Sequence, residues 1–479
     1  MREAARTPFL SCRGQESPPP PARAGEPGRA PSRLRQIWPL VGLILLAVVV
    51  RGGWIGLQID DLSLDEDNYA HVAEVFVQTG TFAHGRGEKD YTRLAPTAHR
   101  PPLYPLMIAF FAGEGSRISV ERIAVLNFLL AIGTIGLVYL FGREAVPEKP
   151  WFAHLAAFLT IFDPLLLDRS AHVMTEGPAA FLAAGFAYAA VRTCKSGRWW
   201  GWIFPGVVLG LAALCRPTFL PVLPLVAGVV FLLELRRQSW QTGLMAAVAV
   251  VLGGAVALGP WTWRNQQVFG KPLLTTTHGG HTLALANSPD YFEQVQKSGF
   301  SSPWEFDAFT HRVSQLPPLL ATVRPDGPGY QSRDPLKELE MDRMLNEMAW
   351  NWIGEHPRDF LYLAFGRLAQ FWKPMPGPLG DHSGWMEALV RYGTGGWYLG
   401  LYALMLLGLP LAWRQGWLPV HLAWWLPLVF VFSGVHFFYW VNMRMRTPLS
   451  PFLCVLAATG LLALVQAGWQ AWARRRSAV

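Results

Sequence analysis

Long apolar runs separated by short polar stretches dominate the amino-acid sequence. Each run is long enough to cross the ~30 Å hydrocarbon core of a bilayer as a helix. The runs predict ten membrane spans, at roughly 37–57, 119–142, 151–167, 176–192, 199–215, 217–235, 241–261, 397–413, 418–436 and 448–468. The pattern therefore predicts an all-α polytopic membrane protein.

Two shorter apolar stretches, 102–112 and 360–372, do not fit this set of alternating spans. Counting either one as a span would invert the orientation of the loops that follow it, and the first is too short to cross the hydrocarbon core. We expect both stretches to form helices that lie at the outer membrane interface. A total of eleven or twelve spans is the alternative.

Charge is distributed unequally between the two ends of the spans. Arg33 and Arg35 precede the first span, whereas Asp60 and Asp61 follow it. Because cytoplasmic loops are rich in lysine and arginine, we expect a multi-pass protein of the inner (plasma) membrane with a cytoplasmic N-terminus. The net charge of +8 then comes largely from the tails and cytoplasmic loops, and it does not indicate a nucleic-acid partner. Only 15% of the residues are charged, which agrees with a chain surrounded by membrane lipids.

Composition divides the chain into four segments. Residues 1–34 are rich in Pro, Arg, Gly and Ser and are expected to form a disordered cytoplasmic tail. Residues 35–261 form an N-terminal transmembrane module whose outer loops carry the candidate catalytic residues. Residues 262–396 form a polar segment on the outer face with an interfacial helix, and residues 397–479 form the C-terminal transmembrane helices and a basic cytoplasmic tail.

An acidic cluster that includes Asp65 and Glu66 follows the first span directly. Carboxylates at a membrane surface are costly to desolvate, and in a cleft they can take a proton from a hydroxyl or hold a metal ion. If a short helix starts here with Ser63 as its cap, Asp65 and Tyr69 share one helical face. The alternative interpretation is a solvated acidic loop.

A second group of carboxylates, Asp163, Asp168 and Glu176, is expected to reach the same outer surface. Two acidic loops on one face favour a paired-carboxylate site over either loop alone. Glu176 also begins a span, where a carboxylate can simply match the positive end of the helix dipole.

Several arginines stand where an apolar span meets a loop. Arg216 lies between two spans beside Pro217, while Arg444 and Arg446 lie with His436 near the start of the last span. The planar guanidinium group suits phosphate oxygens, so these residues indicate a phosphate site. Attraction to lipid headgroups is the alternative. His278 and His281 also suggest a metal site, although no third ligand follows at a suitable spacing.

Taken together, these segments resemble the GT-C superfamily of membrane glycosyltransferases, in particular the protein O-mannosyltransferase and aminoarabinose-transferase-like group (glycosyltransferase family 39). The resemblance extends over about 37–467. It rests on Asp65-Glu66-x-x-Tyr69, Arg100-Pro101-Pro102-Leu103-Tyr104-Pro105, Asp163-Pro164 with Thr175-Glu176, Cys215-Arg216-Pro217-Thr218, Pro260-Trp261-Thr262-Trp263-Arg264-Asn265 with Gly279-Gly280, and Arg444-x-Arg446-x-Pro448.

The resemblance implies an inverting glycosyltransferase with a GT-C-like helical bundle. It would move a sugar from a polyprenyl-phosphate carrier to a lipid, glycan or protein acceptor at an active site on the outer face. Asp65 would be the catalytic base, supported by Glu66, and Glu176 would be the second acidic residue, with Asp168 competing for that role. Glu66 and Glu176 are also the candidates to bind a divalent cation, Mg²⁺ or Mn²⁺. The expected substrate-binding residues are Tyr69, Arg100, Tyr104, Asp168, Arg216, Arg264, His436, Tyr439, Arg444 and Arg446.

Two other functions are compatible with this organisation. An envelope polysaccharide ligase or polymerase that uses a pyrophosphate-linked donor could have a similar topology. A transporter of lipid-linked sugars would also need many spans, but the polar residues gather at one face and no inverted repeat is visible.

Overall fold

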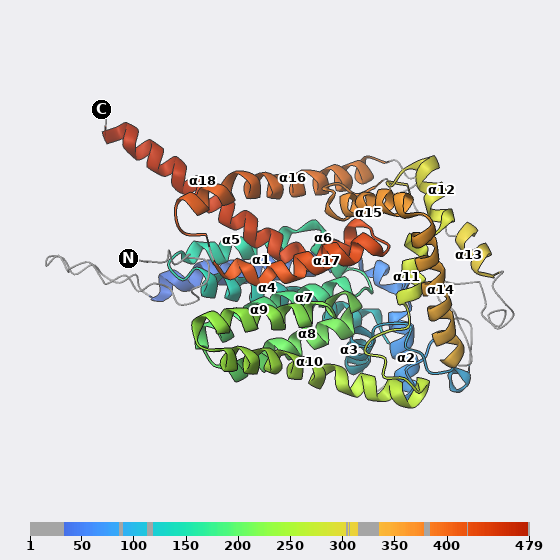
Figure 1. The fold of residues 1–479 in the computed structure, drawn as a ribbon. Helices are drawn as coiled ribbons and strands as arrows, with labels where there is room; N and C mark the ends of the chain where they lie inside the picture. Colours follow the sequence, from blue (N-terminus) through green and yellow to red (C-terminus); the bar gives the residue numbers. More distant parts are fainter. Residues whose placement is uncertain are drawn as a thin grey trace.

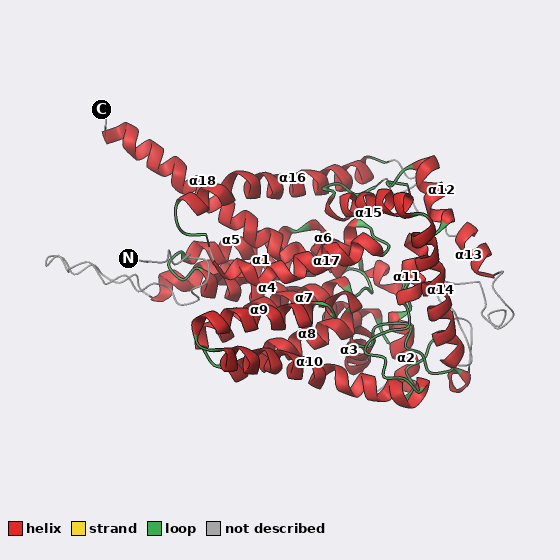
Figure 2. Ribbon diagram, viewed as in Figure 1, coloured by secondary structure: helices red, strands yellow, loops and turns green. Residues whose placement is uncertain are grey.

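The computed structural model describes residues 33–85, 90–112, 118–302, 305, 307–314, 335–377, 384–418 and 420–477. Across these ranges the chain is helical and contains no strand, only an isolated bridge between Ala83 and Pro96 (Figure 2). The expected all-α polytopic fold is therefore confirmed. The expected N-terminal tail, 1–34, lies almost entirely outside the described residues.

Long helices run side by side through the centre of the molecule (Figure 1). Within the described ranges, seven are long and apolar enough to cross a membrane, or eight if one bent pair counts as a span. They include α1 (Arg33–Leu57), α4 (Val120–Ala145), α9 (Val222–Arg237), α10 (Trp240–Phe269), α16 (Trp385–Arg414), α17 (Leu426–Phe438) and α18 (Ser450–Ser477). The bent pair is α5 (Pro150–Phe162) with α6 (Pro164–Ser170), and the two helices meet at 55°. The two other expected spans coincide with α7 (Glu176–Ser196) and α8 (Ile203–Cys215).

Shorter helices gather at the end of the bundle opposite both chain termini (Figure 1). They are α2 (Tyr69–Thr79), α3 (Leu103–Ala112), α11 (Gly279–Ala286), α12 (Pro289–Ser298), α13 (Asp307–Ser314), α14 (Pro335–Glu355) and α15 (Pro357–Trp372). The helices α3 and α15 coincide with the two stretches expected at the membrane interface. We call this end of the molecule the cap.

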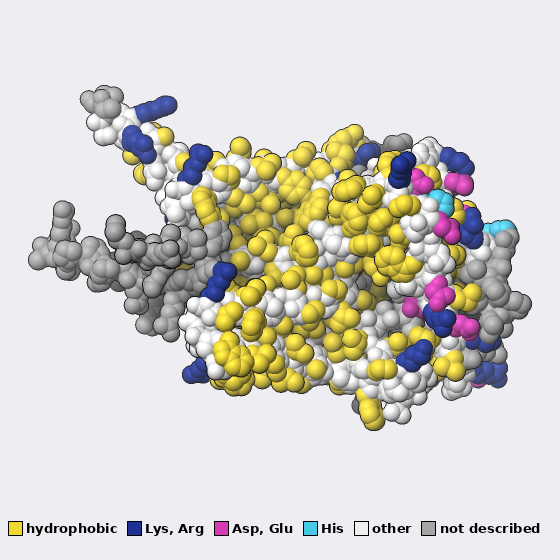
Figure 3. Space-filling view, in the orientation of Figure 1, with side chains coloured by type: hydrophobic (Ala, Val, Ile, Leu, Met, Phe, Trp, Pro, Cys, Tyr) yellow, Lys and Arg dark blue, Asp and Glu magenta, His cyan; other side chains and the backbone are white. Residues whose placement is uncertain are grey.

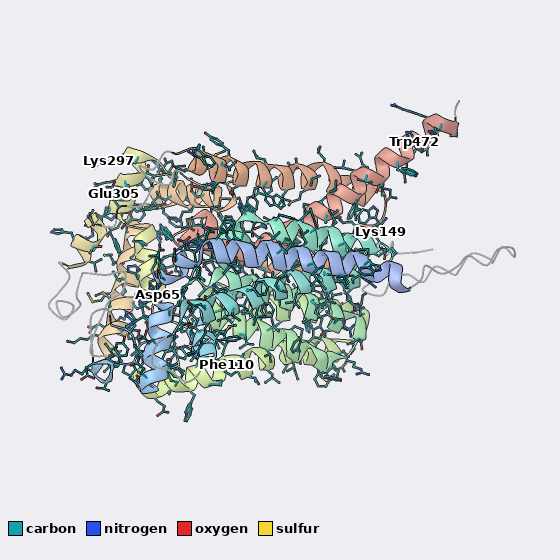
Figure 4. The ribbon with its side chains drawn as sticks, turned by 180° about the vertical axis from the view of Figure 1, so that it is seen from behind. Asp65, Phe110, Lys149, Lys297, Glu305 and Trp472 are labelled. Atoms are coloured by element: carbon teal, nitrogen blue, oxygen red, sulfur yellow. The ribbon has the colours of Figure 1, made fainter. Side chains whose placement is uncertain are left out.

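The surface separates into an apolar belt and a charged cap. Figure 3 shows hydrophobic side chains over the middle of the bundle, with acidic and basic side chains mixed at the cap and only basic ones visible at the other end. From behind, Asp65 lies at the same end as Lys297 and Glu305, whereas Lys149 and Trp472 lie at the opposite end (Figure 4). The first acidic loop and the polar segment after α10 therefore share one end of the molecule.

The expectation that Asp65 and Tyr69 share one helical face is wrong. The helix α2 begins only at Tyr69, after Asn68 takes a left-handed conformation with φ 61°. Asp65 precedes the helix, and its Oδ2 accepts a hydrogen bond from the backbone N–H of His71 at 2.8 Å. Ser63 does not cap α2; it ends a preceding 3-10 turn, where its hydroxyl donates to the carbonyl of Asp60. The unpaired amides at the start of α2 explain the difference, because a carboxylate just outside the helix satisfies them.

Asp163 also differs from expectation, because it lies inside the bundle rather than at the outer surface. It is completely buried between α5 and α6, where it accepts hydrogen bonds from the N–H of Leu166 and from the hydroxyl of Tyr398 on α16. The same hydroxyl contacts Ser450 at the start of α18. This network joins the N-terminal and C-terminal helices in a region where an unpaired polar group would be costly.

Glycines allow α8 and α10 to pack backbone against backbone. Gly206 on α8 faces Val250, and Gly253 on α10 faces Ile203; a Cβ atom on Gly253 would lie 2.1 Å from the Ile203 carbonyl oxygen. Close approach of this kind maximises van der Waals contact between helices that gain little from the hydrophobic effect in lipid.

This packing predicts a large difference between two glycine-to-alanine substitutions. Gly253→Ala should lower the melting temperature of the detergent-solubilised protein, because overpacking costs about 1–3 kcal/mol. Gly228→Ala on α9, where nothing lies within 4 Å of the new methyl group, should leave it unchanged. Equal melting temperatures for the two variants would contradict the observed helix contact.

Candidate active site

A pocket of about 470 Å³ lies where the cap meets the helical bundle. It forms between the acidic loop before α2, the start of α7, the joint between α8 and α9, the start of α11 and the joint between α17 and α18. The sequence-predicted residues that line it are Tyr69, Arg100, Glu176, Arg216, His436, Tyr439 and Arg444. The fold thus brings together residues from both halves of the chain.

The centre of the pocket wall is Glu176, whose side chain is only 2% exposed. Its Oε1 lies 3.0 Å from Nη1 of Arg216 and 3.7 Å from Nε of Arg444. Arg216 also donates to the hydroxyl of Thr175 at 3.1 Å. Glu176 is the first residue of α7, so the helix dipole adds to the stabilisation of its negative charge.

A second ion pair joins the acidic loop to the same pocket. Nη2 of Arg100 lies 2.9 Å from Oδ1 of Asp67. The guanidinium group of Arg100 also lies over the ring of Tyr69, 5.6 Å from its centroid. Burial raises the pKa of the Tyr69 hydroxyl, which keeps it protonated and able to donate a hydrogen bond.

We call Asp67, Arg100, Glu176, Arg216 and Arg444 the charged wall. Three arginines and two carboxylates leave one formal positive charge on it. Two of the arginines donate to thioether sulfur atoms: Arg216 to Met445 at 2.7 Å and Arg444 to Met174 at 3.4 Å. Because sulfur is a weak acceptor, an anionic oxygen entering the pocket can take over these donors.

The two residues predicted to carry the chemistry in the acidic loop, Asp65 and Glu66, do not line the pocket, whereas Asp67 does. Glu66 is exposed. Asp65 is half-buried in the loop; burial raises its pKa, and the backbone amides at the start of α2 offset part of this rise. A raised pKa makes Asp65 a stronger base than an ordinary aspartate. Sequence reasoning named the cluster but did not single out Asp67, since adjacent carboxylates differ only in the direction that the fold gives them.

Four other expected substrate-binding residues lie outside this pocket and make protein contacts instead. Tyr104 donates to Asn127, and Asp168 pairs with Arg169. Arg264 donates to the carbonyls of Phe82 and Thr97. Arg446 donates to the carbonyls of Phe371 and Lys373. Arg446 is completely buried. The bonds of Arg264 and Arg446 hold backbone segments in place.

The start of α11 supplies a wall that the sequence analysis considered only as a metal site. His278 and His281 stack with ring centroids 5.0 Å apart, and His99 meets His278 edge-on at 4.3 Å. Within the described part of the chain, no group of three His, Cys, Asp or Glu side chains is arranged to hold a metal ion. Of the two expected metal ligands, Glu176 is paired with Arg216 and Arg444, whereas Glu66 is exposed.

Glu338 on α14 fixes the loop that carries His99 and Arg100. Its carboxylate accepts hydrogen bonds from the Thr97 hydroxyl at 2.7 Å, the Ala98 N–H at 3.0 Å and the Thr277 hydroxyl. The same residue therefore positions two segments of the pocket. Sequence reasoning missed it because Glu338 lies in an ordinary charged amphipathic stretch.

Comparison with known protein families finds a match over part of the chain. The model of the dolichyl-phosphate-mannose-protein mannosyltransferase family matches residues 99–263. A search of curated protein sequences found no match.

Solved structures give the same relationship at the level of the fold. The oligosaccharyltransferase AglB from Archaeoglobus fulgidus, solved with an inhibitory peptide and a dolichol-phosphate, has a TM-score of 0.52 and 16% identity; the match covers 93% of this chain and 52% of that one. ArnT from Cupriavidus metallidurans, in the apo state, has a TM-score of 0.38 and 15% identity over 89% of this chain and 78% of that one. This chain spans about half the length of AglB. The family model and the fold of AglB agree with the expected resemblance to the GT-C superfamily of membrane glycosyltransferases.

The buried histidines predict how stability depends on pH. Burial lowers the pKa of His99 and of His278 well below 6.5, and that of His281 to about 4. As the pH falls below 6.5, these histidines bind protons in the unfolded chain but stay neutral in the folded protein. Acidification therefore favours the unfolded chain and reduces stability. The melting temperature should therefore fall less for His99→Gln than for wild type between about pH 7.5 and about pH 5.5.

The exposed His311 provides the control for this experiment. Carboxyl groups whose pKa values are raised by partial burial, such as Asp342 at about 6, act in the opposite direction but do so in every variant. The difference between variants therefore isolates the histidine contribution. If the melting temperatures of His99→Gln and His311→Gln both depended on pH as the wild-type melting temperature does, the neutral state of His99 would be contradicted.

Proposed function

We propose that this chain transfers a sugar from a polyprenyl-phosphate carrier to an acceptor at the outer face of the membrane. The observation that carries the proposal is the charged wall, with its single formal positive charge and with one guanidinium nitrogen each of Arg216 and Arg444 that donates to a sulfur atom. The family model and the fold of AglB, which was solved with a dolichol-phosphate, support a lipid-linked phosphate as the ligand.

Charge balance favours a monophosphate donor over the pyrophosphate-linked alternative. A polyprenyl phosphoryl sugar carries one negative charge, which matches the one positive charge of the charged wall. A pyrophosphate-linked donor carries two negative charges, and the second would remain uncompensated in a largely buried pocket.

A second hollow supports a place for the lipid chain. It has a volume of about 550 Å³ and lies between α9 and α10. Leu220 and Pro221 line the active-site pocket, and Leu223 and Pro224, one turn further along, line the second hollow. Its lining is almost entirely apolar, which suits an isoprenoid chain. We call it the chain groove.

The proposed reaction is a single displacement with inversion at the anomeric carbon. A carboxylate of the acidic loop removes the proton from the acceptor hydroxyl, whose oxygen attacks the anomeric carbon. The bond between that carbon and the phosphate oxygen breaks, and polyprenyl phosphate leaves with the electron pair. Arg216 and Arg444 stabilise the charge that develops on the leaving phosphate.

Asp65 is the proposed base, on the basis of its match to the family motif and its raised pKa. Asp67, paired with Arg100 in the pocket, is proposed to orient that arginine toward the phosphate. The reaction is written without a metal step, and the acceptor class is a lipid, glycan or protein. The basic side chains visible in Figure 3 at the end that holds both termini support a cytoplasmic location for that end.

The first test compares three aspartates of one loop in an assay of polyprenyl phosphate release by the purified protein. Asp65→Asn should reduce release at least ~100-fold, because a positioned general base contributes this much, while its amide oxygen can still accept the α2 amides. Asp67→Asn should mainly raise the KM for the donor. The exposed Asp60→Asn should behave as wild type.

The melting temperatures of all three variants show whether each is folded. The same release assay with an added chelator measures any metal requirement. Full release by Asp65→Asn together with loss of release in Asp67→Asn would transfer the role of base to Asp67. No release from any polyprenyl-phosphate sugar by wild type would overturn the proposed function.

A second test fills the chain groove. Ala255→Trp should lower kcat/KM for a long-chain donor about tenfold, since losing contact with roughly two CH₂ groups at ~0.8 kcal/mol each has that effect. A donor with a chain too short to reach the groove should be affected much less. Val256→Trp, on the neighbouring lipid-exposed position outside the groove, is the matched control. Equal effects of Ala255→Trp on both donors would contradict the groove assignment.

A further inference from the structure

The active-site pocket has a second wall that carries no formal charge. It is built around the start of α11 from Thr276, His278, His281 and Thr282, which we call the imidazole wall. The charged wall and the imidazole wall border the same space of about 470 Å³. The proposed phosphate site explains only the charged wall.

The two imidazole rings are held in a defined position. His278 and His281 are three residues apart, so one helical turn places their rings in a stack with an interplanar angle of 25°. His99 packs edge-on against His278 at an interplanar angle of 79°, and the Thr282 hydroxyl donates to the His278 carbonyl at 3.1 Å. Within the described protein the Nδ1 atom of His278 is buried without a hydrogen-bond partner. A buried polar atom of this kind calls for a ligand or water.

The rings are neutral at physiological pH. Burial and the nearby charge of Arg100 lower the pKa of His281 to about 4 and that of His278 well below 6.5. Each neutral imidazole offers one N–H donor and one nitrogen acceptor, the same combination that a sugar hydroxyl offers in return. Their flat faces also suit the apolar C–H side of a sugar ring.

We propose that the imidazole wall is the sugar subsite of the donor pocket, and that it takes a neutral glycosyl group rather than a cationic amino sugar or an anionic uronosyl group. The inference rests on the proposed function. The anomeric carbon is bonded to the phosphate, so the sugar must lie directly beside the charged wall. The imidazole wall is an uncharged polar surface of the same pocket.

Charge accounts for the selectivity. Among the described residues that line the pocket, the carboxylates are Asp67 and Glu176, and both are already paired with arginines. An ammonium group on the sugar therefore meets no unpaired carboxylate in this lining. It would also meet the repulsion of Arg100. A uronosyl carboxylate would add a second negative charge to a pocket whose single positive charge the phosphate already matches.

The test measures binding of two probes in detergent: plain polyprenyl phosphate and the same lipid phosphate carrying a neutral hexosyl group. His278→Phe and His281→Phe keep a flat ring but remove its hydrogen-bonding atoms. Each should weaken binding of the hexosyl probe about fivefold to tenfold, the effect of one lost hydrogen bond, and leave binding of plain polyprenyl phosphate unchanged. His278→Gln should recover part of the loss. His356→Phe, at an exposed histidine that stacks on Trp352 outside the pocket, is the matched control.

A charge-changing variant tests the selectivity directly. Wild type should prefer the hexosyl donor over amino-sugar and uronosyl donors of the same chain length. His281→Asp should shift this preference toward the amino-sugar donor, because it adds an available carboxylate to the imidazole wall. A wild-type preference for either charged donor would overturn the inference.

The two probes separate failure of this inference from failure of the proposed function. Equal weakening of both probes by the phenylalanine variants would show a structural role, and no weakening of either would show that the sugar lies elsewhere; both results overturn the subsite. If wild type binds plain polyprenyl phosphate while the variants give either of these results, the proposed function is retained. Wild type that binds neither probe overturns both.

Discussion

Burial of the Glu176 carboxylate between Arg216 and Arg444 is the interaction on which the pocket depends. It joins α7, the joint between α8 and α9, and the segment before α18, which are far apart in sequence. Removing one partner from a buried ion pair typically costs about 3–5 kcal/mol, because the remaining charge stays uncompensated. The same residues that hold these segments together therefore also create the positive charge of the pocket.

Around this centre, most of the other buried charges hold backbone segments rather than ligands. Glu338 fixes the loop that carries His99 and Arg100, Arg264 binds the carbonyls of the same region, and Arg446 binds the end of α15. Each replaces hydrogen bonds that an irregular loop lacks. The cap can thus be built from short helices and loops and still present a defined surface at the end of the bundle (Figure 1).

The three surfaces of the proposed site correspond to the three parts of the proposed donor. The charged wall suits a phosphate, the chain groove suits an isoprenoid chain, and the imidazole wall suits a neutral sugar. Leu220 and Pro221 line the pocket, and Leu223 and Pro224 line the groove, so the pocket and the chain groove have neighbouring linings at the start of α9. A single ligand that spans them would gain from charge, packing and hydrogen bonding together, which is how one site can select one class of donor.

The sequence by itself determined the membrane class, the order of the spans and the end of the molecule where the polar residues gather. These features follow from hydropathy and charge, which are properties of a continuous stretch of chain. It also identified Glu176, Arg216 and Arg444, since charges at the ends of apolar spans are conspicuous. Only the tertiary structure decided that Asp67 rather than Asp65 lines the pocket, that Arg446 is a structural residue and Arg444 a pocket residue, and that His278 and His281 form a wall. The direction of each side chain depends on packing between segments distant in sequence, and no local pattern records it.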